Sequence, residues 1–281
     1  MTARPVVVGV DGSPSSTAAA EHAAAVAAGR GAPLLLVHGY LHPRGYGSAP
    51  LEPYHAFPPP PPAHGDVMLS DLAGSLRKTH PDLEVSHKQI LGGGAATLVD
   101  ESRGADLVVV GCRGHGTLAG LLLGSVSSQV VAHARCPVLV VRPAEAGPPA
   151  SSPVAVGVDG SPASTSALAH AVAEAARRGV VLRVLYAAGK DDDADSTQVE
   201  HVLTGAVETA LAAQPDLEID SEILRHADPA AALVDASKDA AVMVVGSRGR
   251  GGFTGLLLGS VSQALVHHAH CPVLVIPPQA S

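Results

Sequence analysis

Two loops of this sequence place glycines and a terminal serine at a spacing that suits the binding of an anion. Both follow the pattern G-x-x-G-x(9)-G-S, as "GCRGHGTLAGLLLGS" at 111–125 and "GSRGRGGFTGLLLGS" at 246–260. Glycine lets backbone amides approach a phosphate without a Cβ in the way and permits positive φ, and a helix that begins at the Gly-Ser end adds unpaired amides. The pattern predicts a backbone phosphate-binding loop, present twice: Gly111, Gly114, Gly124 and Ser125, and Gly246, Gly249, Gly259 and Ser260.

Basic residues lie beside these glycines in both loops. Arg113 and Arg248 could each add a charge-assisted contact to a phosphate, and they could equally be solvated loop arginines, so both interpretations stay open. His115 in the first loop corresponds to Arg250 in the second, which makes a basic residue common to that position. Val126 and Val261, which follow the two serines, complete the candidate site.

An aspartate ends the first apolar run of each copy, in "DGSPSS" and "DGSPAS". Ser13 is a good helix N-cap and Pro14 suits the first helical position. Asp11 and Asp159 could satisfy turn amides, or they could accept hydrogen bonds from a ligand. Because Ser13 already offers a cap, we expect Asp11 to be partly free for a ligand.

Other kinds of site are poorly supported. No Lys-Ser or Lys-Thr follows the glycines, so the loops are not P-loops, and the first strand does not end in the dinucleotide-binding G-x-G-x-x-G. The "HHAH" at 267–270 does not place its histidines on one helical face, which favours a solvated helix end over a metal site. The three cysteines form no C-x-x-C pair, and no residue stands out as a nucleophile or general base.

The sequence contains an internal repeat that covers most of its length. "VVVGVDGSPSSTAAAEHA" at 6–23 matches 154–171, and "GLLLGSVSSQVVAHARCPVLVV" at 120–141 matches 255–276. The first copy holds extra residues, which we place in a proline-rich insert at 41–66. A Pro-, Ala- and Gly-rich stretch between the copies indicates two domains, 1–146 and 154–281, joined by a linker at 147–153.

Short apolar runs alternate with alanine-rich stretches of helical length, which is typical of a parallel sheet covered by helices. For the first copy we predict strands at 5–10, 33–39, 83–90, 106–110 and 137–141, and helices at 14–29, 66–79, 95–103 and 125–134. The strands show no polar alternation, as burial on both faces requires. The result is a doubly wound α/β domain, made twice, with ligands expected beyond the carboxyl ends of its strands.

The composition excludes some partners. A net charge of -8 over 281 residues provides no basic face for nucleic acid or anionic lipid. The N-terminal apolar run is too short for a signal peptide, and no later run is long enough to cross a membrane. We therefore expect a cytoplasmic protein with a small-molecule partner and an as yet unnamed protein partner.

The strand-one aspartate, the G-x-x-G-x(9)-G-S loop and the "CPVLVV" type of final strand resemble the universal stress protein family, as a tandem two-domain member. The resemblance implies two five-stranded parallel sheets in the order 3-2-1-4-5, and ATP as the ligand. It implies that Asp11 and Asp159 bond the ribose or adenine side, that backbone near Gly39 and Ala187 meets the adenine, and that the loop glycines and serines hold phosphates. Mg²⁺ would bind through the phosphates, since it uses few carboxylates.

The first copy departs from the family pattern. The loop after its third strand reads "LGGGAATLV", whereas "HADPAAALV" in the second copy is close to the usual Asp-Pro form. With the proline-rich insert beside it, the first site is expected to bind differently or to be covered.

The resemblance implies a regulatory protein, with slow ATP hydrolysis at most. One alternative is an interaction module of the same fold that binds no nucleotide. Another is an adenylate-forming enzyme, but "DGSPSS" lacks the Ser-Gly-Gly-x-Asp-Ser loop that such enzymes use. The apolar edge strands at 137–141 and 272–276 predict that the two domains pack through them as a pseudo-twofold pair, and homodimerisation of the whole chain stays open.

Overall fold

The two copies form two similar halves in a computed structural model of the chain, which describes residues 3–41, 62–114, 123–142, 149, 151–189, 196–249 and 258–278. The first half contains β1 (Val6–Gly9), α1 (Pro14–Arg30), β2 (Leu34–Tyr40), α2 (Ala63–Thr79), β3 (Val85–Leu91), α3 (Gly94–Glu101), β4 (Leu107–Gly111), α4 (Ser125–His133) and β5 (Val138–Val141). The second half contains β6 (Val154–Gly157), α5 (Pro162–Arg178), β7 (Leu182–Ala188), α6 (Ser196–Ala213), β8 (Ile219–Arg225), α7 (Pro229–Ala236), a 3-10 helix (Ser237–Asp239), β9 (Val242–Gly246), α8 (Ser260–His268) and β10 (Val273–Ile276).

All predicted elements of the first half are present, with one notable shift. The helix predicted at 66–79 begins at Ala63, directly after Pro62, so the last residues of the predicted insert are helical. Proline fixes its own φ and precedes a helix without cost, which explains the earlier start. The part of the insert at 42–61 lies outside the described residues.

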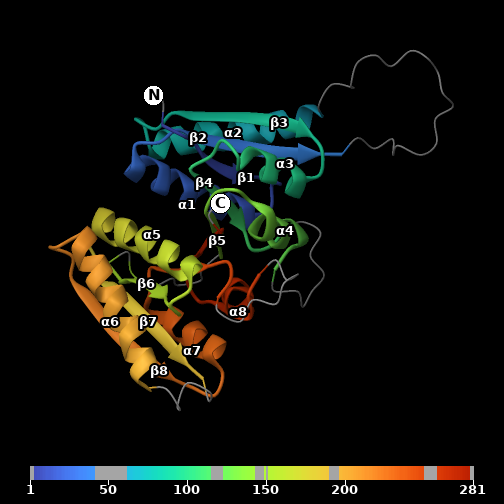
Figure 1. Cartoon of the computed structure of the whole chain (residues 1–281). Coiled ribbons are helices and arrows are strands. Elements are labelled where there is room, and N and C mark those ends of the chain that lie inside the picture. Colours follow the sequence, from blue (N-terminus) through green and yellow to red (C-terminus); the bar gives the residue numbers. More distant parts are fainter. Residues whose placement is uncertain are drawn as a thin grey trace.

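The strands form one sheet in the order β3-β2-β1-β4-β5-β10-β9-β6-β7-β8. Each half has the predicted order 3-2-1-4-5 with parallel neighbours, and β5 pairs with β10 antiparallel, Leu139 opposite Leu274. The predicted pseudo-twofold pair is confirmed, and the two halves share a continuous sheet (Figure 1).

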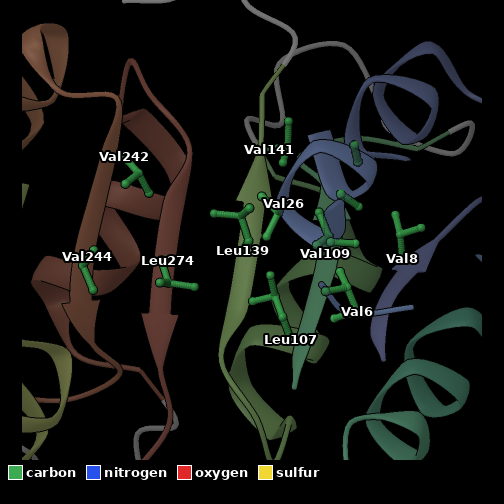
Figure 2. Packing of buried hydrophobic residues seen from close by; sticks show 14 of the residues in the cluster. Val6, Val8, Val26, Leu107, Val109, Leu139, Val141, Val242, Val244 and Leu274 are labelled. Carbon is green, nitrogen blue, oxygen red and sulfur yellow. The ribbon is translucent and has the colours of Figure 1, made fainter. Parts of the chain in front are cut away.

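Two apolar layers cover the faces of this sheet. Side chains of α1, α2, α5 and α6 pack on one face, and side chains of α3, α4, α7 and α8 pack on the other. Leu139 of β5 and Leu274 of β10 point toward each other where the halves meet, and both belong to the first layer (Figure 2). The apolar core therefore runs across the junction without a break. No described helix is long and apolar enough to span a membrane.

The sequence signals at the ends of α1 explain where this helix starts and stops. Ser13 adopts extended backbone and its side chain accepts from the amide of Ser16, while Pro14 takes the first helical position. Gly31 ends the helix in the left-handed conformation, with φ 60°. The helix α5 repeats this arrangement, so the loop before each helix has a fixed shape.

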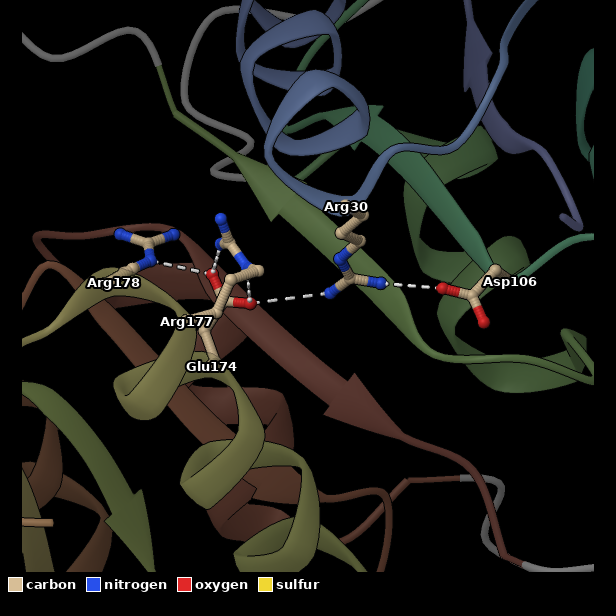
Figure 3. A network of polar contacts seen from close by, with 5 residues as sticks. All are labelled: Arg30, Asp106, Glu174, Arg177 and Arg178. Atoms are coloured by element: carbon tan, nitrogen blue, oxygen red, sulfur yellow. Dashed lines mark hydrogen bonds and ion pairs between the residues drawn. The ribbon is translucent and has the colours of Figure 1, made fainter. Parts of the chain in front are cut away.

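A buried carboxylate joins α1 to α5 across the two halves (Figure 3). Glu174 is 6% exposed and accepts from Arg177 Nη2 at 2.5 Å and from Arg178 Nε at 2.7 Å. Arg30 of α1 lies 3.5 Å from Glu174 and also pairs with Asp106 at 2.9 Å. Burial alone would raise the pKa of Glu174, but the hydrogen bonds and charges of Arg177 and Arg178 outweigh it, and the pKa is lowered.

Candidate functional site

A cavity of about 410 Å³ lies at the carboxyl ends of β1, β2 and β4 in the first half. The N-termini of α3 and α4 complete its wall. The structure brings together in this wall every predicted first-site residue that it describes: Asp11, Gly39, Gly111, Arg113, Gly114, Gly124, Ser125 and Val126. His115 and Arg250 lie outside the described residues.

Close approach, and not backbone conformation, explains glycine at Gly111 and Gly114. A Cβ on Gly111 would lie 2.6 Å from Ser15 Oγ, and one on Gly114 would lie 2.5 Å from Asp11 Oδ2. Gly124 has extended backbone with φ -74°. Among the described glycines, positive φ occurs at Gly12, Gly31, Gly92, Gly160 and Gly179, so the expected use of positive φ in the two loops is wrong for their described glycines.

Gly124 keeps the space above the loop open. A Cβ there would lie 3.6 Å from the carbonyl oxygen of Cys112 and 3.8 Å from the amide nitrogen of Gly114. These are ordinary contacts, so a side chain would fit without a clash but would extend over the loop backbone. Glycine at this position therefore leaves room for a ligand between the loop and α4.

Asp11 serves the turn and lines the cavity at the same time. Its Oδ1 accepts from the amide of Ser13 at 3.0 Å and from Ser13 Oγ at 2.6 Å, and the residue is exposed. Ser13 Oγ also accepts from the amide of Ser16 at 3.2 Å, as the cap requires. The capping serine therefore does not release Asp11 from the turn as expected, because its hydroxyl donates to Asp11 while it caps the helix.

The helix α4 starts at the cavity without a side-chain cap. Its N-cap is Gly124, whereas α1 has a capping serine. Ser127, in the first turn of α4, donates from Oγ to the carbonyl of Gly111 at 2.6 Å and is buried. This bond fixes the positive end of α4 against the end of β4. The sequence analysis missed Ser127, although a serine recurs at the matching position as Ser262.

The end of β2 forms the other side of the cavity. A Cβ on Gly39 would lie 2.8 Å from Gly94 Cα, so β2 and the start of α3 approach each other closely here. His38 and Leu98 also line the cavity and were not predicted. His38 Nδ1 lies 2.7 Å from the carbonyl oxygen of Val10, and because that oxygen can only accept, Nδ1 carries the proton.

The unusual loop "LGGGAATLV" leaves this side of the first site open. Gly93 is the N-cap of α3 and makes no side-chain cap bond, whereas Asp228 caps α7 by accepting from the amide of Ala230 at 2.9 Å. In the second half, Ala187 and Pro229 stand where Gly39 and Gly94 line the first cavity. Where the second half has the side chains of Ala187 and Pro229, the first half has glycines and therefore more open space.

The second half repeats the loop framework with one change. Asp159 Oδ1 accepts from the amide of Ser161 at 2.9 Å, and a Cβ on Gly249 would collide with Asp159 Oδ2. The helix α8 starts at Ser260 after the uncapped Gly259, with Val261 next in the helix, and Ser262 Oγ donates to the carbonyl of Gly246 at 2.7 Å. Arg248 is exposed.

The two halves differ in a pair of residues beneath the glycine loop, one from the first helix of the half and one that directly follows its fourth strand. In the first half Ser15 Oγ lies 3.9 Å from Cys112 Sγ and accepts from the amide of Arg113 at 3.3 Å. In the second half Ala163 and Ser247 occupy these places, and Ser247 Oγ is buried with no hydrogen-bond partner among the described residues.

The three cysteines are free and buried. Burial raises the pKa of Cys136 and Cys271 to about 12, and Cys112 is buried. Within the described part of the chain, no three His, Cys, Asp or Glu side chains form a group that could hold a metal ion.

Known proteins resemble this chain over nearly its whole length. The model of the universal stress protein family matches residues 2–142 and 151–277. A universal stress protein of Mycobacterium tuberculosis is 38% identical over 96% of this chain and 95% of its own, and one of Mycolicibacterium smegmatis is 36% identical over 98% and 97%. The crystal structure of a universal stress protein from Archaeoglobus fulgidus has the same fold, with a TM-score of 0.67 at 17% identity and 98% coverage of both chains.

Proposed function

This chain belongs to the universal stress protein family, and from that premise we propose that it is a stress-response regulatory protein that binds ATP. The observation that carries the proposal is the cavity of about 410 Å³ in which Asp11, the first glycine loop and the uncapped start of α4 meet. Its size is within the range of small-molecule sites.

The phosphates would lie against the loop and α4. The amides at the start of this helix have no side-chain cap, and the space over Gly124 is open to a ligand. Arg113 is exposed on the cavity wall and would supply positive charge, and the hydroxyl of Ser125 would supply a further hydrogen bond. Mg²⁺ would be held mainly by phosphate oxygens, since the described residues offer no cluster of carboxylates.

The nucleoside would lie toward β2. Val37, Gly39 and Leu98 give this side of the cavity apolar surface and close access to backbone, which suits a flat base. Asp11 is exposed on the cavity wall, and its carboxylate would accept from the sugar hydroxyls. His38 is held in place by its hydrogen bond to the carbonyl oxygen of Val10 and adds a polar side chain to the cavity wall. The sequence analysis did not predict this residue.

We propose a second site in the second half, because Asp159, Gly249 and the start of α8 repeat the framework of the first. The proposed domains are 1–146 and 154–281. Nucleotide occupancy would stabilise one conformation or assembly of a cytoplasmic protein and thereby regulate an unidentified protein partner. The described site holds no activated nucleophile, so we propose slow hydrolysis at most.

The test begins with the purified chain. Mass spectrometry of small molecules released on denaturation identifies a carried nucleotide, and calorimetry with ATP and Mg²⁺ gives the affinity. Gly114→Val and Gly249→Val together should lower affinity by at least about tenfold, because each new side chain would displace the aspartate beside it.

Gly74→Val in α2 is the matched control, since a Cβ there meets nothing within 4 Å. It should leave ATP affinity unchanged. If the double loop variant binds ATP as well as the wild type does, the loops do not hold phosphate. If ATP produces no shift in melting temperature and no heat of binding, the alternative of an interaction module without nucleotide is correct.

A further inference from the structure

Arg142 of the first half holds the end of a helix of the second half. It follows β5 directly, and its Nη2 donates to the carbonyl oxygen of Val266 at 2.7 Å and to that of His267. Both carbonyls belong to the last turn of α8. The side chain is half buried, and its Nε has no hydrogen-bond partner among the described residues, so the helix carbonyls are its main anchor.

This contact has a clear electrostatic reason. The last carbonyls of a helix have no partner within the helix and carry the negative end of its dipole. A guanidinium between two of them satisfies both and opposes the negative charge. Because β5 and β10 run antiparallel, the end of β5 comes to lie beside the end of α8.

This contact between Arg142 and the end of α8, the Arg142 bridge, has no equivalent from the second half to the first among the described residues. The residue of the second half that corresponds to Arg142 is Pro277, in "CPVLVIP" against "CPVLVVR". Proline has no donor in its side chain or its backbone. The end of α4 is thus not held from the second half as the end of α8 is held from the first.

Arg142 also stands next to the first candidate site. The carbonyl of Val141 accepts from the amide of Cys112 at 2.9 Å, which ties the bridge to the first glycine loop. Burial lowers the pKa of Arg142, Cys112 opposes this shift, and the positive charge of Arg113 on the cavity wall adds to it. At its other end, α8 begins at Ser260 in the second glycine loop, about 13 Å away along the helix axis.

We propose that Arg142 is a positioning residue for the second site and couples the two sites to each other. The proposal rests on the proposed function. A ligand that fixes the first glycine loop would also fix the end of β5 through the hydrogen bond from the Cys112 amide to the Val141 carbonyl, and Arg142, the next residue, would then hold α8 more firmly. Occupancy of the first site therefore tightens binding at the second, and by linkage the reverse is also true.

The first arm of the test needs no nucleotide. Hydrogen exchange of the full chain is compared for the wild type, Arg142→Gln and Arg142→Lys. In Arg142→Gln the amides of α8 should exchange at least about threefold faster while those of α4 are unchanged, and Arg142→Lys should restore part of the protection. Equal exchange in α8 of all three proteins would overturn the bridge itself.

The second arm uses ATP with Mg²⁺ and one open site at a time. With the first site closed by Gly114→Val, Arg142→Gln should weaken binding at the second site about 3- to 10-fold, and Arg142→Lys should recover most of it. With the second site closed by Gly249→Val, Arg142→Gln should leave affinity unchanged. In the chain with both sites open, the wild type should bind ATP with positive cooperativity that Arg142→Gln abolishes.

The outcomes separate the two proposals. An equal effect of Arg142→Gln on both sites, or on neither, refutes the positioning role while ATP binding stands. Two independent, equal sites in the wild type refute the coupling. A wild-type chain that binds no ATP refutes the proposed function and the coupling together, and the exchange measurement then decides separately whether Arg142 positions α8.

Discussion

Replacing Glu174 by glutamine removes the buried negative charge that Arg30 of α1 and two arginines of α5 share. Glutamine keeps the size of the side chain and one acceptor oxygen, but Arg177 and Arg178 lose their charge-assisted bonds of 2.5 Å and 2.7 Å. Arg30 of the other half loses its partner at 3.5 Å and keeps only Asp106. The substitution therefore acts on both halves of the chain at once.

The expected loss is about 3 kcal/mol in the free energy of unfolding at pH 7. Breaking a buried ion pair costs about 3 to 5 kcal/mol, and hydrogen bonds to a charged group contribute about 1.5 to 3 kcal/mol each. The lower end applies because Arg177 and Arg178 keep 27% and 19% of their side-chain exposure and so part of their hydration. The loss should shrink in acid, because a carboxyl with lowered pKa stabilises above its unfolded value of about 4.5 and ceases to do so as pH falls through its folded pKa.

Urea denaturation followed by circular dichroism measures this loss from pH 7 to about pH 3, below the unfolded pKa of Glu174. The exposed Glu21→Gln on α1 is the control and should change the free energy of unfolding by less than about 0.5 kcal/mol. A double-mutant cycle with Arg30→Gln isolates the part that crosses between the halves. A loss for Glu174→Gln no larger than that of the control would show that the arginines are fully compensated by solvent and that this reasoning is wrong.

Three further substitutions concern polar groups elsewhere in the fold. Ser127→Ala should cost about 1 to 2 kcal/mol because it leaves the buried carbonyl of Gly111 without its bond, whereas Ser247→Ala should raise stability by about 1 kcal/mol because its hydroxyl has no partner among the described residues. Thermal unfolding compares the two, and shifts of the same sign would contradict the bonding pattern. His22 has its pKa lowered by burial and by Arg178, against a smaller opposite effect of Glu174, so its contribution is complete above its unfolded pKa of about 6.5 and is lost as pH falls through the folded pKa. His22→Gln should therefore flatten the fall in stability between pH 7.5 and 5.5, and an unchanged slope would refute this assignment.

The sequence alone predicted the features that depend on local chemistry. Continuous valine and leucine runs predicted buried parallel strands, and Ser13 followed by Pro14 predicted where α1 begins. The repeated glycine loops predicted which residues would gather at one end of the sheet. These signals are local or periodic, so the order of residues carries them directly.

Features that arise only from packing were not predictable. The reason for glycine at Gly111 and Gly114 is the approach of Ser15 and Asp11, which are distant in the chain. The contribution of Ser127 depends on where β4 ends relative to α4, and that of Arg142 on the antiparallel junction. For Ser127 and Arg142 the partner is a backbone carbonyl, which leaves no trace in the identity of the residue that provides it.

The junction between β5 and β10 also frees the chain from a constraint that symmetric assemblies obey. When two identical subunits meet about a twofold axis, every substitution appears on both sides of the contact. Here the two sides are separate stretches of one polypeptide, held at high effective concentration by the chain between them. Each can change alone. Arg142 already bonds to the end of α8, and Pro277, at the matching position, has no donor with which to bond to the end of α4. Duplication within one chain therefore allows two nearly equal halves to acquire different residues at their junction and different roles.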